Sequence, residues 1–281
     1  MLRKGFAFAA LGLLLVAGSA QAAGTEAELR DVHWSFEGPL GKFDKAQLQR
    51  GYKVYREVCA ACHSMNLLYF RNLGQKGGPF YEEKFANPND NPFVKSLAKD
   101  AQVNDIDQDT GDVIQRPGTS ADKFPAPFPN EAAARASNGG AAPPDLSVMA
   151  KAREGGPAYV YSLLTGFRNP PAGLTLSPSQ HYNPWFPGDL SSSWSGSHDK
   201  VPVGGAIGMA PPLAAGKVTF DDGTPSTIDQ QAKDVTAFLA WAADPKAEER
   251  KAFGLGAMIY LVLFSIILWF SYKAVWRNVS H

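Results

Sequence analysis

Two internal segments of the chain have apolar residues at helical spacing. In the first segment the recurring positions are Leu48, Tyr52, Tyr55 and Cys59, and Asp44 stands at the position of an N-terminal cap. In the second they are Ile228, Val235, Phe238 and Trp241, preceded by Thr227 as the cap, with Gln230 three residues later. The pattern therefore predicts one helix that runs up to Cys59 and another that begins after Thr227.

A long uncharged run near the C-terminus predicts a membrane-spanning helix. Residues 252–272 contain no charged side chain, and at about 1.5 Å per residue such a run matches the roughly 30 Å hydrocarbon core of a bilayer. A buried core helix is the alternative explanation for the run. Lys251 precedes it, whereas Lys273 and Arg277 follow it, and this weak basic excess favours a cytoplasmic C-terminus.

The N-terminus has the features of a secretory signal peptide. Arg3 and Lys4 precede an apolar run over residues 6–16, and Ala20-Gln21-Ala22 is a small-x-small cleavage pattern. An uncleaved anchor is the alternative, but a run of this length is short for a bilayer. The predicted organisation is a cleaved signal peptide (1–22), an extracytoplasmic domain (23–246), and a transmembrane anchor with a short cytoplasmic tail (247–281).

Composition adds two constraints. The formal net charge of +0 carries no nucleic-acid signature, so no nucleic-acid partner is expected. Gly 27 and Pro 21 are high counts, which predict long loops between helices. We therefore expect a mainly α, loop-rich domain between the two ends.

The chain's only two cysteines stand in one short motif. Cys59 and Cys62 are three residues apart, and His63 follows directly. This spacing is that of a haem attached through two thioether bonds, with the adjacent imidazole bound to its iron. The sequence thus predicts one covalently bound haem c, held by Cys59 and Cys62, with His63 as an axial ligand.

Other uses of two cysteines fit less well. A disulfide between residues so close together closes a small, strained loop and joins nothing distant. A structural zinc site needs four ligands, and no second cysteine pair exists. A thioredoxin-like dithiol has no use for His63 and should follow a strand, which the pattern does not indicate.

The sixth iron ligand is less clear from the residues alone. Met65 follows the motif too closely to reach the opposite face of the ring, and Met258 lies in the membrane run. Met149 is in a short predicted helix over residues 146–153, where packing in the core is its ordinary role. Met209 lies in a glycine- and proline-rich segment, predicted to be a loop, that could hold one side chain against the haem, and we favour it. A bis-histidine site would draw on His33, His181 or His198.

The chain also resembles a known family. The segments that carry the likeness are residues 50–65, 143–147, 159–166, 182–188, 209–213 and 220–225. In this order, and with a C-terminal anchor, they resemble the cytochrome c1 family, the haem c subunits of cytochrome bc1 complexes. The resemblance covers nearly the whole chain after the signal peptide and implies an enlarged class I cytochrome c-type haem domain.

The resemblance implies roles for individual residues. Met209 falls in the family's ligand motif and is expected to bind the iron, and Arg153 and Tyr159 are expected to contact a haem propionate. From the residues alone, a surface salt bridge and a core aromatic would be their ordinary roles. Two departures from the family pattern are a longer loop over residues 189–203 and the missing second cysteine pair of some bacterial relatives. What holds the Met209 loop in place is therefore open.

The activity implied is one-electron transfer. Ubiquinol would be oxidised at cytochrome b, the Rieske iron-sulfur protein would deliver one electron to this haem, and a soluble or anchored cytochrome c would accept it. The chain has no catalytic acid, base or nucleophile of its own, so it would be enzymatic only within the proton-translocating assembly. The expected location is the bacterial cytoplasmic membrane, in contact with lipid, with the haem domain on the periplasmic side. The alternatives are a free-standing membrane-anchored carrier or oxidase subunit, and a haem enzyme or gas sensor with an open axial site.

An acidic segment has two possible readings. Its aspartates are Asp100, Asp105, Asp107, Asp109 and Asp112. A calcium loop is excluded because Thr110 and Arg116 occupy positions that require glycine and glutamate. The cluster either steers a basic cytochrome c or is a solvated loop.

Overall fold

The computed structural model describes residues 27–278, so the predicted signal peptide lies outside the described residues. The helices are α1 (Lys45–Glu57), α2 (Pro92–Lys99), α3 (Glu131–Ser137), α4 (Met149–Ala152), α5 (Gly156–Thr165), α6 (Ile228–Ala243) and α7 (Ala247–Val275). The short 3-10 helices are η1 (Cys59–Ala61), η2 (Phe70–Gly74), η3 (Pro88–Asp90), η4 (Ser191–Ser193) and η5 (His198–Lys200). The strands are β1 (Gln102–Ile106), β2 (Val113–Pro117), β3 (His181–Asn183) and β4 (Gly205–Ile207). The expectation of a mainly helical, loop-rich domain is confirmed.

The two long domain helices begin where their caps predict. The Asp44 carboxylate accepts the backbone N–H of Gln47 at 2.7 Å, and α1 follows. The Thr227 hydroxyl accepts the N–H of Gln230 at 3.1 Å, and α6 follows. Each cap satisfies a backbone donor that the first turn of the helix leaves unpaired. Both predicted starts are therefore confirmed.

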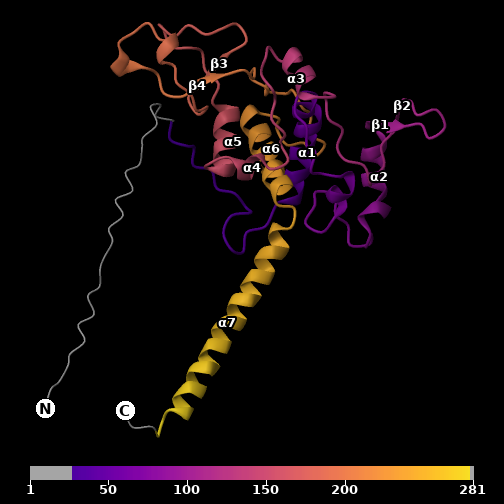
Figure 1. Ribbon diagram of the computed structural model, residues 1–281, viewed down its shortest axis with the longest axis vertical. Helices are drawn as coiled ribbons and strands as arrows, with labels where there is room; N and C mark the ends of the chain where they lie inside the picture. Colours follow the sequence, from indigo (N-terminus) through magenta and orange to yellow (C-terminus); the bar gives the residue numbers. More distant parts are fainter. Residues whose placement is uncertain (1–26, 279–281) are drawn as a thin grey trace, which may run out of the picture.

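Helices α1 and α6 pack against each other at Gly51 (Figure 1). A Cβ atom built on Gly51 would lie 2.0 Å from the carbonyl oxygen of Asp234 and 2.7 Å from Cβ of Phe238. No larger residue fits this approach. Beside it, Arg50 of α1 holds the fully buried Asp234 of α6 through two hydrogen bonds of 2.8 and 3.2 Å, which fixes the register of the two helices.

An aromatic cluster fills the space around this crossing. Phe238 and Trp241 of α6 stack with ring centroids 5.5 Å apart, and Phe238 also lies 5.7 Å from both Tyr52 and Tyr55 of α1. Phe124, from the loop after β2, stacks on Tyr55 at 5.9 Å. Large buried rings dominate the energetics of such cores, so this cluster contributes strongly to the packing of α1 against α6.

Two small antiparallel sheets were not predicted. Strands β1 and β2 form a hairpin that projects from the domain, and β3 pairs with β4 across more than twenty residues of chain (Figure 1). The segment around Met209 was expected to be entirely loop, but Gly205–Ile207 is strand β4. A second, smaller core of Leu174, Tyr182 and Leu190 lies beside this sheet. The pairing partners of such short strands are set by tertiary contacts, which explains why the local pattern did not reveal them.

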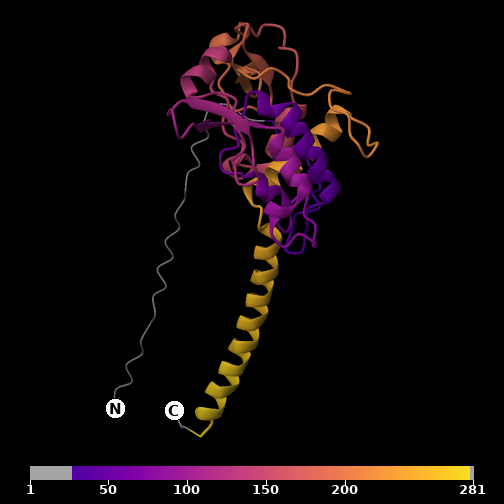
Figure 2. The ribbon, with the colours of Figure 1, turned by 90° about the vertical axis from the view of Figure 1, so that its right-hand side faces the viewer.

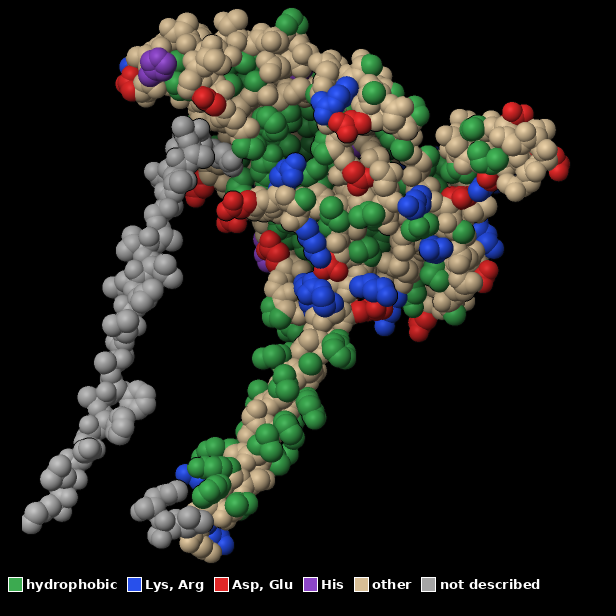
Figure 3. Space-filling model, viewed as in Figure 1, with side chains coloured by type: hydrophobic (Ala, Val, Ile, Leu, Met, Phe, Trp, Pro, Cys, Tyr) green, Lys and Arg blue, Asp and Glu red, His purple; other side chains and the backbone are tan. Residues whose placement is uncertain are grey.

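Beyond its first turns, helix α7 extends away from the rest of the domain (Figures 1 and 2). It is longer than the uncharged run, has a mean hydropathy of 2.3 in its most apolar window, and none of that window is buried. Figure 3 shows hydrophobic side chains along its length and Lys and Arg side chains gathered at the lower edge of the domain above it. A helix of this length and composition can span a membrane.

The first turns of α7 are tied to the domain. Glu248 accepts the backbone N–H of Phe43 at 2.9 Å, and Lys251 donates to the carbonyl oxygens of Phe36 and Gly41. Phe43 directly precedes the Asp44 cap, so the N-terminal end of α1 lies next to α7. With 13 residues, α1 is about 20 Å long, and its other end points away from the membrane helix.

Candidate haem-attachment site

The Cys-x-x-Cys-His motif occupies a single tight turn at the far end of α1. After α1 ends at Glu57, the 3-10 helix η1 begins at Cys59. The backbone N–H groups of Cys62 and His63 both donate to the carbonyl oxygen of Cys59, at 3.1 and 2.9 Å. The structure therefore brings the three predicted residues together on one turn, as attachment along one edge of a haem requires.

The imidazole of His63 is oriented by a backbone carbonyl. Its Nδ1 lies 2.8 Å from the carbonyl oxygen of Pro144, so Nδ1 carries the proton and Nε2 presents its lone pair. Burial lowers the pKa of His63, against the opposing effects of the Pro144 carbonyl and of Asp145. The neutral ring, with one nitrogen held and the other open, is the form that binds iron.

Asp145 fastens the Pro144 segment to the residues that follow His63. Its carboxylate accepts hydrogen bonds from the Ser64 hydroxyl and from the N–H groups of Asn66 and Ser147, each at 2.8 Å. Burial alone would raise the pKa of Asp145, but these hydrogen bonds outweigh it and the pKa is lowered. The carboxylate stays ionised and fixes the carbonyl that orients His63.

The two cysteines have different surroundings. Both thiols are free, Cys62 is exposed, and burial raises the pKa of Cys59 to about 12. Cys59 thus stays protonated among core residues, while Cys62 lies at the surface of the turn. Free thiols on one turn beside an imidazole with an open nitrogen form a donor set that fits a haem c.

Met209 lies two residues after β4 and is half-buried. A Cβ built on the neighbouring Gly208 would lie 2.9 Å from Cβ of Ala141, and Ala141 is three residues before Pro144. The Met209 loop therefore packs beside the segment that orients His63. Among the rival methionines, Met65 is fully buried and Met149 packs against the main core. The assignment of Met209 as a ligand stays a prediction.

Arg153 and Tyr159 lie on either side of the junction between α4 and α5. Arg153 follows α4 in extended conformation and is exposed, with its guanidinium donating to the carbonyl oxygen of Ala152 at 3.1 Å. Tyr159 is on α5 with 6% of its surface exposed. Between them Gly155 and Gly156 have φ of 75° and 51°, a conformation suited to glycine. Their contact with a haem propionate stays a prediction.

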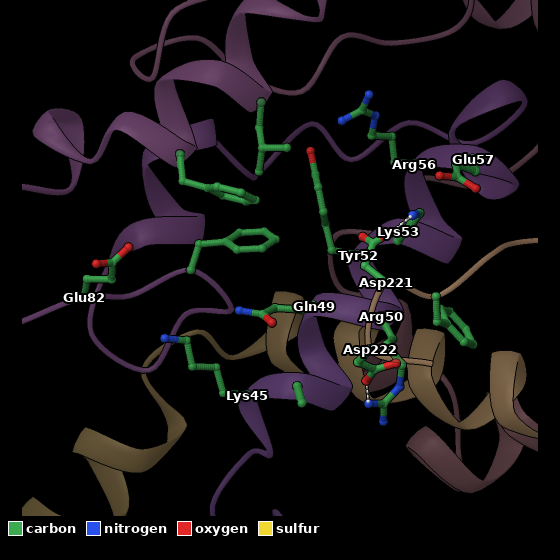
Figure 4. A pocket seen from close by; sticks show the side chains of 15 residues that line it. Lys45, Gln49, Arg50, Tyr52, Lys53, Arg56, Glu57, Glu82, Asp221 and Asp222 are labelled. Carbon is green, nitrogen blue, oxygen red and sulfur yellow. Dashed lines mark hydrogen bonds and ion pairs between the residues drawn. The ribbon is translucent and has the colours of Figure 1, made fainter. Parts of the chain in front are cut away.

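A cavity beside α1 lies away from the predicted site residues. It has a volume of about 550 Å³ and lies along the outer face of α1, where it includes none of the predicted site residues. Figure 4 shows two ion pairs at its edge, Arg50 with Asp222 and Lys53 with Asp221. These pairs join α1 to the segment before α6, so the cavity wall has a structural use.

Four of the five clustered aspartates lie in the hairpin of β1 and β2, whereas Asp100 directly follows α2. Asp105 pairs with Arg116, which also holds Asp122, and Asp107 accepts the N–H groups of Asp109 and Thr110 in the turn. At least two of the clustered aspartates therefore stabilise the hairpin. Its use as a steering surface stays a prediction.

Sequence reasoning missed the residues that orient His63. Pro144 and Asp145 stood out only as part of a family segment, because their partners are about 80 residues away in the chain. The pair of prolines before Asp145 was the one available signal, since a residue before proline favours extended backbone. Nothing local indicated that its carbonyl would meet the imidazole.

The fold and the site together define a class. A helical domain with a Cys-x-x-Cys-His turn, an imidazole held at Nδ1 and a terminal apolar helix has the architecture of membrane-anchored c-type cytochromes. The model of the Cytochrome C1 family matches residues 34–279. This chain belongs to the cytochrome c1 family.

Individual relatives support this family assignment. "Cytochrome c1" of Rhodospirillum rubrum is 38% identical over 98% of this chain and 97% of its own length. "Cytochrome c1, heme protein, mitochondrial" of Kluyveromyces lactis is 43% identical over 88% of this chain and 76% of its own. "Cytochrome b/c1" of Bradyrhizobium diazoefficiens is 44% identical over 88% of this chain, but the chain spans only 35% of that protein's length.

Proposed function

We propose that this chain carries one covalently bound haem c and is the electron-transfer subunit of a quinol-oxidising cytochrome bc1 complex. It would accept one electron from a Rieske iron-sulfur protein and pass it to a soluble or anchored cytochrome c. The observation that carries the proposal is the turn of Cys59, Cys62 and His63, with His63 held at 2.8 Å by the Pro144 carbonyl. Membership of the cytochrome c1 family supports the rest.

Each of the predicted site residues would have a separate role toward the haem. Cys59 and Cys62 would hold the ring covalently, His63 and Met209 would bind the iron, and Arg153 with Tyr159 would contact a propionate. When bound, the haem would supply a one-electron couple. The Pro144 carbonyl holds the proton on Nδ1 of His63, so the ring would bind as the neutral imidazole without having to exchange that proton.

The architecture supports a relay close to a membrane. Helix α7 would hold the domain in the cytoplasmic membrane of a bacterium, with the domain on the periplasmic side and cytochrome b beside it. The relative named "Cytochrome b/c1" joins both components in one name, which favours this partner. The Cys59–His63 turn would then face away from the bilayer, where a soluble acceptor can reach it.

The test uses the full chain. With a tag after His281, the protein is isolated from native membranes in mild detergent, and its reduced-minus-oxidised spectrum is recorded. Two b-type haems and an iron-sulfur signal alongside one haem c are expected. A haem c that remains alone under the gentlest extraction would instead mean a free-standing carrier, and a spectrum without haem c would refute the site itself.

A further inference from the structure

The chain that follows Met209 returns at once to the domain core. Leu213 is 7% exposed and Val218 is fully buried in the main core. Between them the backbone N–H of Lys217 donates to the carbonyl oxygen of Ala214 at 3.1 Å, and Gly216 adopts a φ of 73°. Residues 213–218 therefore form a tight turn whose two ends are anchored by apolar side chains, a few residues from the predicted iron ligand.

One fully buried amide on α6 holds this turn. The Nε2 atom of Gln231 lies 2.7 Å from the carbonyl oxygen of Ala214 and 3.1 and 3.0 Å from the carbonyl and hydroxyl oxygens of Ser226. The N–H of Gly216 also donates to the Ser226 carbonyl, at 2.8 Å. Gln231 thus joins three separate stretches, which are the turn after Met209, the chain before α6, and α6 itself.

The oxygen of the same amide does not contribute to holding the turn. Oε1 of Gln231 has no hydrogen-bond partner within the described part of the chain, although Gln231 has no exposed surface. An unpaired buried acceptor costs free energy that an apolar residue of the same size would avoid. The hydrogen bonds made by Nε2 are therefore what distinguishes glutamine from an apolar side chain at this position.

Lys217 adds a second restraint from the surface side. Its ammonium donates to the carbonyl oxygen of Pro212 at 2.7 Å, three residues after Met209. The same positive charge acts on the thiol of Cys59, whose pKa it lowers against the larger effect of burial. The turn therefore lies within electrostatic reach of the haem-attachment residues.

We propose that Gln231, assisted by Lys217, is the positioning residue that holds the sulfur of Met209 against the haem iron. The proposal rests on the proposed function, because it assumes that Met209 is the axial ligand. A thioether is a neutral, weak ligand, so the fraction of protein in which it leaves the iron depends on how far its loop can move. Pairing of β4 with β3 restrains the loop before Met209, and Gln231 with Lys217 restrains it afterwards. This arrangement supplies the support that a second cysteine pair would otherwise give.

The test compares Gln231→Met with Gln230→Met in the haem-loaded full chain in detergent. Gln230 is the preceding residue of α6 and bonds Asp234 at 2.9 Å, away from the Met209 turn. For Gln231→Met we expect a lower midpoint potential and about tenfold faster carbon monoxide binding to the reduced haem, the factor that corresponds to losing one or two net hydrogen bonds. Gln230→Met should leave both unchanged, and Lys217→Met should move both in the same direction as Gln231→Met by a smaller amount.

Two outcomes distinguish a failure of the positioning role of Gln231 from a failure of the assignment of Met209 as the iron ligand. If Met209→Leu leaves the potential and the near-infrared band of ferric methionine ligation unchanged, Met209 is not the ligand and the proposed site fails. If Met209→Leu removes that band but Gln231→Met keeps the potential and carbon monoxide rate of the unmodified protein, only the positioning role is overturned. The thermal midpoint of each variant distinguishes a loosened loop from general unfolding. Lys217→Met changes an exposed side chain and should fold normally, so it tests the restraint without disturbing the core.

Discussion

Replacing Gly51 by alanine would force α1 and α6 apart. The new Cβ would stand 2.0 Å from the backbone oxygen of Asp234 and 2.7 Å from Cβ of Phe238, so the helices must separate by about 1.5 Å to restore ordinary contact distances. The first obstacle is backbone and cannot turn away as a side chain would. Overpacking of this kind costs about 3 kcal/mol, the upper part of the usual range.

Helix propensity works in the opposite direction. Alanine is favoured over glycine by about 1 kcal/mol in a helix interior, so Gly51→Ala should lower the free energy of unfolding by about 2 kcal/mol. For a domain of this size that corresponds to a fall of about 4–8 °C in the thermal midpoint. The shift would also move the far end of α1, so the haem midpoint potential should change with it.

The assay is thermal unfolding of the haem-loaded protein in detergent, with Ala46→Gly as the matched control. Ala46 is an exposed position in the first turn of the same helix, and its change to glycine should cost at most about 1 kcal/mol through propensity alone. If Gly51→Ala raised the thermal midpoint by the amount that Ala46→Gly lowers it, the close approach of the two helices would be disproved.

Three further predictions concern the site and the base of the domain. Asp145→Asn should reduce the free energy of unfolding by about 1–3 kcal/mol in chemical denaturation, because one of its three donors loses its acceptor; an unchanged value would mean that the carboxylate does not fasten the Pro144 segment. Met209→Leu should lower the midpoint potential in redox titration and admit carbon monoxide, whereas Met149→Leu should do neither. Burial alone would raise the pKa of Asp244, but hydrogen bonds from Lys151 and Arg250 lower it, so its contribution to stability is present above about pH 4 and is lost as the pH falls through the lowered pKa. Asp244→Asn should remove this acid-side loss from thermal midpoints measured across pH, and an identical pH profile would contradict the assignment.

Helices α1 and α6 were predictable because their signals are local. Asp44 and Thr227 stand at cap positions directly before apolar residues at helical spacing, and both helices begin where these caps indicate. The strands were not, because β3 and β4 are three residues long and meet only after more than twenty intervening residues. A short strand has no periodicity of its own and exists through its partner.

One part of the site could likewise be predicted from local sequence, and another part could not. Cys59, Cys62 and His63 are adjacent in the chain, so their motif could be recognised without a structure. The carbonyl of Pro144 and the amide of Gln231 act on residues that are far away in sequence, and any residue type can supply a carbonyl. Interactions of this kind depend on the assembled fold, and no spacing rule identifies them.

The hydrogen bonds that tie the first turns of α7 to the domain have a mechanical consequence. Glu248 and Lys251 hold Phe43 and the loop before it, so α7 and α1 move as one body. Membrane helices tilt to match the thickness of the bilayer, so a tilt of α7 within a bilayer would tilt the domain with it. With the Cys59–His63 turn about 20 Å from the base, a tilt of about 10° displaces it by about 3 Å. Bilayer thickness would thereby influence how far the Cys59–His63 turn stands from the membrane surface.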